Sequence, residues 1–181
     1  MYTRPEGRLR VLVTSGTRTL MLDTAGGSIR HLVDQLALAG AEVLIAAPEE
    51  AAEKFGAELG DVHIGWIPLD MVAPTCDLAV HHGGATTATT LMAAGVPQLV
   101  IPDNGYGKAV GLAMSGFGAG LTLMPQQLEP DQDPGEAIAA GCREILSNPQ
   151  YAQQAQALAT EIASLPRPCE VLHTLETLAA Q

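Results

Sequence analysis

The sequence is poor in aromatic and basic residues. It has one Trp, three Tyr and two Phe among 181 residues, although 47% of the chain is hydrophobic. The core must therefore be built from Ala, Leu, Val and Ile, a composition typical of a buried parallel sheet covered by helices. Nine Lys and Arg residues stand against twenty Asp and Glu, giving a net charge of −11. This charge argues against nucleic acid or an anionic membrane as the partner, since both favour basic residues.

Cysteines and long apolar runs are also scarce. Cys76, Cys142 and Cys169 are widely spaced and form no CxxC pair, which argues against a disulfide framework or a zinc site. No apolar run reaches the roughly 20 residues that span a membrane. The first ten residues, MYTRPEGRLR, lack the apolar core of a signal peptide. We therefore expect a cytoplasmic protein with no nucleic-acid or membrane partner.

The length suits one domain with a proper core and is too short for two. Apolar runs alternate with helical patterns: we expect strands at 9–14, 41–47, 61–66, 76–81, 97–102 and 120–123, and helices at about 27–39, 49–59, 85–94 and 107–117. This alternation is typical of βαβ units, and it predicts an α/β fold with a Rossmann-like, doubly wound parallel sheet of about six strands. A helical C-terminal tail is expected to follow, with helices at about 135–147, 149–163 and 169–180.

The stretch HHGGATTATT at 81–90 is the most informative motif. Its four threonines are poor helix formers, because β-branched side chains lose rotamer freedom in a helix. Ligands of open α/β sheets bind beyond the carboxyl ends of the strands. A strand ending at His81, then two glycines and a helix beginning near Ala85, would present backbone N–H groups and the positive end of a helix dipole there. The motif therefore suggests a phosphate site.

Two interpretations are open from the residues alone. In the first, a phosphate approaches the two glycines and receives hydrogen bonds from His82, Thr86 and Thr87. In the second, the glycines only form a tight turn and Thr86 is an ordinary N-cap. The spacing fits neither G-x-G-x-x-G nor a P-loop, which disfavours nicotinamide and P-loop sites. His81 is expected to face the core rather than a ligand.

The order of motifs resembles the C-terminal half of GT-B glycosyltransferases. Trp66-Ile67-Pro68 is followed by CDLAVHHGG at 76–84, the threonine-rich helix, GVPQLVIP at 95–102 and GFGAG at 116–120. More narrowly, the sequence is similar to the actinobacterial enzymes that attach deoxysugars to polyketide antibiotics. The tail LPRPCEVLHTLETLA is similar to the aromatic-polyketide branch of that family. The resemblance covers essentially the whole chain.

The resemblance implies a site for a nucleoside diphosphate sugar. The base would stack on Trp66 and pair with the backbone of Ile67, whereas the residues alone favour a lone core tryptophan. Diphosphate contacts are implied for His82, Gly84, Ala85, Thr86 and Thr87, with Gly16 and Thr17 closing from the first loop. Nucleotide contact is also implied for Thr90, and sugar contacts for Asp103, Tyr106 and Gly107.

Three positions depart from the family pattern. Thr90 stands where many relatives carry a Glu that holds the ribose hydroxyls, which favours a thymidine diphosphate donor, whose sugar lacks the 2′-hydroxyl. Tyr106-Gly107 replaces an Asp-Gln pair that binds sugar hydroxyls, which suits a deoxysugar. Thr86 stands where this branch has a smaller residue, so the turn is narrower but gains a donor.

Family members have a second, N-terminal domain that carries the acceptor pocket and the base. The resemblance implies a linker remnant at 1–8, a donor-binding domain at 9–165 and a helix at 166–181 that crosses to the N-terminal domain. No catalytic residue is expected in this chain. The implied partners are that N-terminal domain, a dTDP-deoxysugar donor and a natural-product acceptor, with a homodimer possible. The implied reaction inverts the anomeric carbon and uses no metal or other cofactor.

Other functions stay open at this point. The chain could be a stand-alone nucleotide-diphosphate-binding module without catalysis. A nucleotide-sugar epimerase of related fold would need acid and base carboxylates in the cleft, and Asp103 is the only obvious one. We therefore expect the donor-binding half of a deoxysugar glycosyltransferase, which transfers no sugar on its own.

Overall fold

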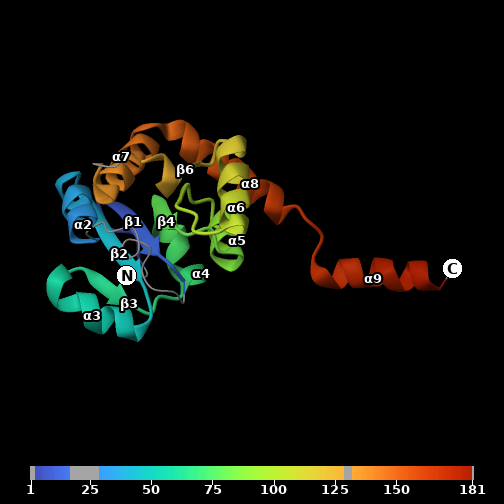
Figure 1. The fold of residues 1–181 in the computed structure, drawn as a ribbon. Helices are drawn as coiled ribbons and strands as arrows, with labels where there is room; N and C mark the ends of the chain where they lie inside the picture. The colour runs from blue at the N-terminus through green and yellow to red at the C-terminus, as the bar shows by residue number, and fades with distance from the viewer. Residues whose placement is uncertain (1–2, 17–28, 129–131, 181) are drawn as a thin grey trace.

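A parallel sheet forms the centre of the molecule (Figure 1). The computed structural model describes residues 3–16, 29–128 and 132–180. The strands of its sheet lie in the order β3-β2-β1-β4-β5-β6, and every neighbouring pair is parallel. Their bounds are β1 (Leu9–Thr14), β2 (Ala41–Ala46), β3 (His63–Gly65), β4 (Leu78–His81), β5 (Gln98–Val100) and β6 (Gly120–Thr122). The order reverses between β1 and β4, which opens a ligand crevice beyond their carboxyl ends.

Helices cover both faces of the sheet (Figure 1). Side chains of β1 alternate between them: Val11 and Val13 pack in one core with α2, α3 and α7, whereas Leu12 packs in a second core with α4 and α5. A third cluster joins α6 to α8 through Met114 and Ala155. The bounds are α2 (Ile29–Leu38), α3 (Glu49–Leu59), α4 (Leu69–Val72), α5 (Ala85–Ala93), α6 (Gly105–Phe117), α7 (Pro134–Ser147) and α8 (Pro149–Ala163), with 3-10 turns η1 (Ala73–Thr75) and η2 (Pro125–Gln127).

The predicted α/β fold is therefore confirmed, including the doubly wound arrangement of six strands. Five of the six predicted strands are longer than the observed ones, and the difference is largest, three residues, for 61–66 against β3 and for 97–102 against β5. In the second case the apolar run continues past the sheet, since Ile101 is buried without being part of the strand. Helix α4 was not predicted, because a single turn has no periodicity to detect.

A network of ion pairs and hydrogen bonds lies at the amino-terminal ends of the central strands. Arg10 of β1 is almost fully buried, although arginine is usually exposed. Its guanidinium donates to the carboxylate of Glu42 at 2.7 Å and to the hydroxyl of Thr75 at 2.6 Å. Its backbone N–H donates to the carboxylate of Asp77 at 2.8 Å. These partners join β1, β2 and the start of β4 at the edge opposite the crevice.

The last helix, α9 (Pro168–Ala179), extends away from the sheet and its covering helices (Figure 1). Its apolar side chains Val171, Leu172, Leu175 and Leu178 are all exposed. Helical spacing places them at intervals of three and four residues, as in a stripe that packs on a partner. Among the helices of the described part of the chain, none is long and apolar enough to cross a membrane.

Candidate functional site

Glycines pack closely where the loops after β1 and β4 and the start of α6 meet, at the carboxyl ends of the strands. A Cβ on Gly16 would lie 3.3 Å from Cε1 of His82, and a Cβ on Gly84 would lie 2.7 Å from Nε2 of the same ring. On the other side, a Cβ on Gly83 would lie 2.6 Å from the Cα of Gly107. Gly83 also has φ +87°, a conformation that favours glycine. Small residues are therefore needed where these loops meet.

The N-terminus of α5 lies at this junction and has no side-chain cap. Its N-cap residue is Gly84, and its first turn contains no acidic residue. By contrast, α6, α7 and α8 each begin with an Asn or Asp whose side chain accepts a backbone N–H: Asn104, Asp133 and Asn148. The first amides of a helix point along the positive end of its dipole. Helix α5 thus presents an N-terminus suited to an anion.

The threonines of α5 differ in their surroundings. Thr86 is exposed in the first turn, Thr87 is buried and Thr90 is half-buried. The hydroxyl of Thr89 donates back to the carbonyls of Ala85 at 2.9 Å and Thr86 at 3.2 Å. The interpretation of Thr86 as an ordinary N-cap is wrong, because the helix begins at Ala85 and Gly84 occupies the cap position. Thr86 is left as an exposed hydroxyl at the helix N-terminus.

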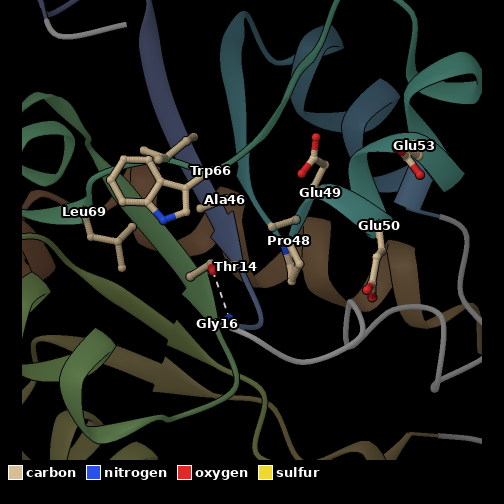
Figure 2. A pocket seen from close by; sticks show the side chains of 11 residues that line it. Thr14, Gly16, Ala46, Pro48, Glu49, Glu50, Glu53, Trp66 and Leu69 are labelled. Carbon is tan, nitrogen blue, oxygen red and sulfur yellow. Dashed lines mark hydrogen bonds between the residues drawn. The ribbon is translucent and has the colours of Figure 1, made fainter.

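A pocket of about 620 Å³ lies beside this junction, at the carboxyl ends of β1, β2 and β3. Figure 2 shows Trp66 on one side of it, and Glu49, Glu50 and Glu53 of α3 on the other. The side chain of Trp66 is 79% exposed, so its indole face is open to a ligand and the core interpretation is wrong. Ile67 is buried, so only its backbone could serve a ligand.

The glutamates of α3 were missed as site residues by the sequence analysis. The available signal was their position, since they follow β2 directly and therefore lie at the same carboxyl edge as the predicted loops. They line the pocket opposite Trp66. The first loop closes the pocket through Gly16, whose N–H donates to the hydroxyl of Thr14 at 3.0 Å. Thr17 lies outside the described residues.

The three predicted sugar contacts lie in different environments. Asp103 and Tyr106 are exposed beside the N-terminus of α6. Gly107 is buried under the glycine turn, and its N–H donates to the side chain of Asn104 at 2.9 Å. The amide nitrogen of Asn104 in turn donates to the carboxylate of Asp103 at 2.7 Å. Contact with a sugar stays a prediction for all three, while Gly107 also lets α6 approach the turn.

The two histidines of the motif face different ways. His81 is fully buried, as expected for a core-facing residue, whereas His82 is half-buried between Gly16 and Gly84. Burial lowers the pKa of His81 to about 4, so its ring is neutral near pH 7. Within the described residues, no three His, Cys, Asp or Glu side chains are grouped as a metal would require.

Fold and site together define a class: a Rossmann-like domain with an uncapped helix N-terminus at the switch point of its sheet and an open pocket beside it. Residues 30–178 match the family model "Erythromycin biosynthesis protein CIII-like, C-terminal domain". The chain belongs to this family of antibiotic glycosyltransferase domains, which confirms the resemblance seen in its motifs.

Curated relatives agree with the family. The chain is 37% identical to the elloramycin glycosyltransferase ElmGT of Streptomyces olivaceus, over 94% of this chain and 42% of the relative. It is 33% identical to the aclacinomycin-T 2-deoxy-L-fucose transferase of Streptomyces galilaeus, over 98% of this chain and 40% of the relative. The chain thus spans about two fifths of the length of these relatives.

Solved structures show the same fold. The glycosyltransferase SsfS6 of Streptomyces sp. SF2575, complexed with thymidine diphosphate, superposes with a TM-score of 0.74 at 27% identity, over 96% of this chain and 42% of that one. The spinosyn rhamnosyltransferase SpnG, also complexed with thymidine diphosphate, superposes with a TM-score of 0.75 at 28% identity, over 96% of this chain and 46% of that one.

Proposed function

We propose that the chain is the donor-binding half of an inverting glycosyltransferase. It would serve to move a deoxysugar from a dTDP-sugar to a polyketide or similar natural-product acceptor. The observation that carries this proposal is the uncapped N-terminus of α5, which opens beside a pocket with an exposed Trp66. Relatives that transfer deoxysugars, and similar structures that hold thymidine diphosphate, support the same reading.

The proposed donor pose follows the arrangement of the site. The base stacks on the exposed indole of Trp66 and pairs with the backbone of Ile67. The diphosphate lies at the N-terminus of α5, where it accepts hydrogen bonds from backbone amides, His82 and the exposed hydroxyl of Thr86. Thr90 carries no carboxylate to bind a 2′-hydroxyl, which is the basis for proposing thymidine diphosphate rather than uridine diphosphate as the donor nucleotide.

The proposed chemistry is a direct displacement. An acceptor oxygen attacks the anomeric carbon, the bond from that carbon to the diphosphate breaks, and its electron pair leaves with the diphosphate. The acceptor proton passes to a base on the N-terminal domain, so no residue of this chain is assigned a catalytic proton transfer. The helix dipole, backbone amides and His82 stabilise the charge that develops on the diphosphate. We propose that this stabilisation takes the place of a metal ion.

The domain division expected from the sequence is part of the proposal. Residues 9–165 bind the donor, residues 1–8 belong to an interdomain linker, and 166–181 cross to the N-terminal acceptor domain. The exposed apolar side chains of α9 support the last assignment, since they need a covering partner. The relatives, which are more than twice as long as the matched region, have room for such a domain. We place the reaction in the cytoplasm.

Transfer assays test this proposal directly. The chain would be joined to an N-terminal acceptor domain taken from a relative such as the elloramycin glycosyltransferase, and product would be measured with a dTDP-deoxysugar donor and that relative's acceptor. We expect transfer by the joined protein and none by the chain alone. Transfer by the chain alone would refute the half-enzyme proposal. Tight nucleotide binding without transfer in every combination would favour a stand-alone binding module.

A further inference from the structure

Two fully buried polar side chains, His81 and Gln98, have no place in the proposed donor contacts. They end β4 and begin β5, which are neighbouring strands in which Ala79 pairs with Gln98 and His81 with Val100. Since successive strand residues alternate between faces, His81 and Gln98 lie on the same face of the sheet as Ala79, which packs in the core with α5. His81 lies in the HHGG motif and Gln98 in the GVPQ motif, two of the motifs on which the family resemblance rests.

Hydrogen bonds connect these side chains to the glycine turn on one side and to α5 on the other. The N–H of Gly83 donates to Nδ1 of His81 at 3.0 Å. The ring proton is therefore on Nε2, which donates to Oε1 of Gln98 at 2.7 Å. The amide nitrogen of Gln98 is then free to donate to the carbonyl of Ala88 in α5 at 3.3 Å. The three hydrogen bonds thus run in one direction, from the turn through His81 and Gln98 to α5.

The series determines which backbone groups of the turn face the ligand. Because the N–H of Gly83 points inward to His81, it is not a donor to the diphosphate, and that role passes to the amides at the start of α5. Rotating this peptide would break the buried hydrogen bond to His81, and there is no room beside Gly83 for a side chain, since a Cβ there would lie 2.6 Å from the Cα of Gly107. Turn and helix are thereby held in one relative orientation.

We propose that His81 and Gln98 are positioning residues of the donor site, which orient the glycine turn and the first turn of α5 to receive a nucleoside diphosphate. This inference rests on the proposed function, because it assumes that the diphosphate binds at this helix N-terminus. Neither side chain touches the ligand. His81 acts through the backbone of Gly83, which adjoins the amides proposed to bind the diphosphate, and Gln98 acts through His81 and the carbonyl of Ala88 in α5.

Two substitutions of His81 separate positioning from mere packing. His81→Asn keeps an acceptor close to the position of Nδ1, and His81→Gln keeps a donor close to the position of Nε2. Each variant loses one of the two ring hydrogen bonds, so both are expected to lower the unfolding midpoint to a similar extent. Thymidine diphosphate affinity, measured by calorimetry, should separate them: within about threefold of the original for His81→Asn, and at least about tenfold weaker for His81→Gln.

Gln98→Met tests the other half of the pair without altering His81. It removes the acceptor of Nε2–H and also the donor to the carbonyl of Ala88 in α5, a hydrogen bond that both His81 variants keep. It is therefore expected to weaken thymidine diphosphate binding, because α5 loses its link to the pair. Equal affinities of His81→Asn and His81→Gln would overturn the inference. If His81→Gln does not fold, unchanged affinity in Gln98→Met overturns it instead.

Amide hydrogen exchange tests the positioning role without any ligand, and therefore independently of the proposed function. In the ligand-free protein, the N–H of Gly83 should stay protected in His81→Asn and lose protection in His81→Gln. An original chain that binds no thymidine diphosphate would refute the proposed function. Equal exchange of Gly83 in both variants would refute the positioning role, whatever the affinity of the original chain.

Discussion

Replacing Gly84 by Ala is expected to weaken diphosphate binding by displacing the ring of His82. Gly84 has φ −64° and ψ 137°, a conformation that alanine adopts without strain. A Cβ there would lie 2.7 Å from Nε2 and 2.9 Å from Cε1 of His82, closer than non-bonded atoms approach. The ring must therefore move away from the helix N-terminus, while the backbone stays as it is.

The size of the effect follows from the contact that His82 is proposed to make. One charge-assisted hydrogen bond contributes about 1.5–3 kcal/mol, so its loss corresponds to about 10- to 150-fold weaker binding. The free energy of unfolding should fall by only about 1 kcal/mol, because alanine is a poorer N-cap than glycine. Calorimetric titration with thymidine diphosphate and urea denaturation measure the two quantities on the same protein.

Gly116→Ala is the matched control for this substitution. Gly116 lies in α6, and a Cβ there meets nothing within 4 Å. It should leave the affinity unchanged and raise the free energy of unfolding by about 0.5–1 kcal/mol, since alanine is the better helix former. In a His82→Ala background, Gly84→Ala should cost no further affinity, because the displaced ring is absent. Additive losses, or a Gly84→Ala affinity within about twofold of the original, would refute the reasoning.

Three further predictions concern the nucleotide, the buried histidine and the buried arginine. Competition calorimetry should show a preference for thymidine over uridine diphosphate that Thr90→Glu reduces; a uridine preference in the original chain would contradict the proposed donor. Burial lowers the pKa of His81 from 6.5 to about 4, so the unfolded chain takes up this proton first as the pH falls. The free energy of unfolding should therefore drop by about 3 kcal/mol from pH 6.5 to 4. In His81→Asn this part of the decrease should be absent; if the free energy of unfolding depends on pH equally in the variant and the original chain, the prediction is wrong. Arg10→Ala should lower the free energy of unfolding by at least about 2 kcal/mol, because the buried hydroxyl of Thr75 and the half-buried carboxylate of Glu42 both lose this donor. The affinity for thymidine diphosphate, which binds at the opposite end of the strands, should stay unchanged; thermal unfolding and calorimetry check the two parts.

Strong local patterns made most of the fold predictable from the sequence. The apolar run at 9–14 has the bounds of β1, and Gly40 lies between the end of α2 and the start of β2, where a glycine is expected to end a helix. Errors occurred where the pattern was short or continued beyond the element, as at α4 and at Ile101. Arg10 could not be foreseen as a core residue, because its burial depends on Glu42 and Thr75, which are distant in sequence.

The candidate site was predictable in position more than in detail. The carboxyl edge followed from the order of strands and helices, and the family resemblance pointed to Trp66 and His82. Contacts between loops could not be deduced, since the approach of Gly83 to Gly107 depends on how β4 and β5 pair. The same pairing brings His81 to Gln98, so a link between the HHGG and GVPQ motifs became visible only in three dimensions.

Titration of thymidine diphosphate into the chain tests the central claim most directly. The account predicts saturable binding to one site that is weak, because the proposed acceptor domain would supply the second wall of the cleft and without it the diphosphate stays partly solvated. His82→Ala should weaken this binding by at least about tenfold, whereas Gly116→Ala should leave it unchanged. No binding, or binding that survives His82→Ala undiminished, would contradict a donor site at the N-terminus of α5.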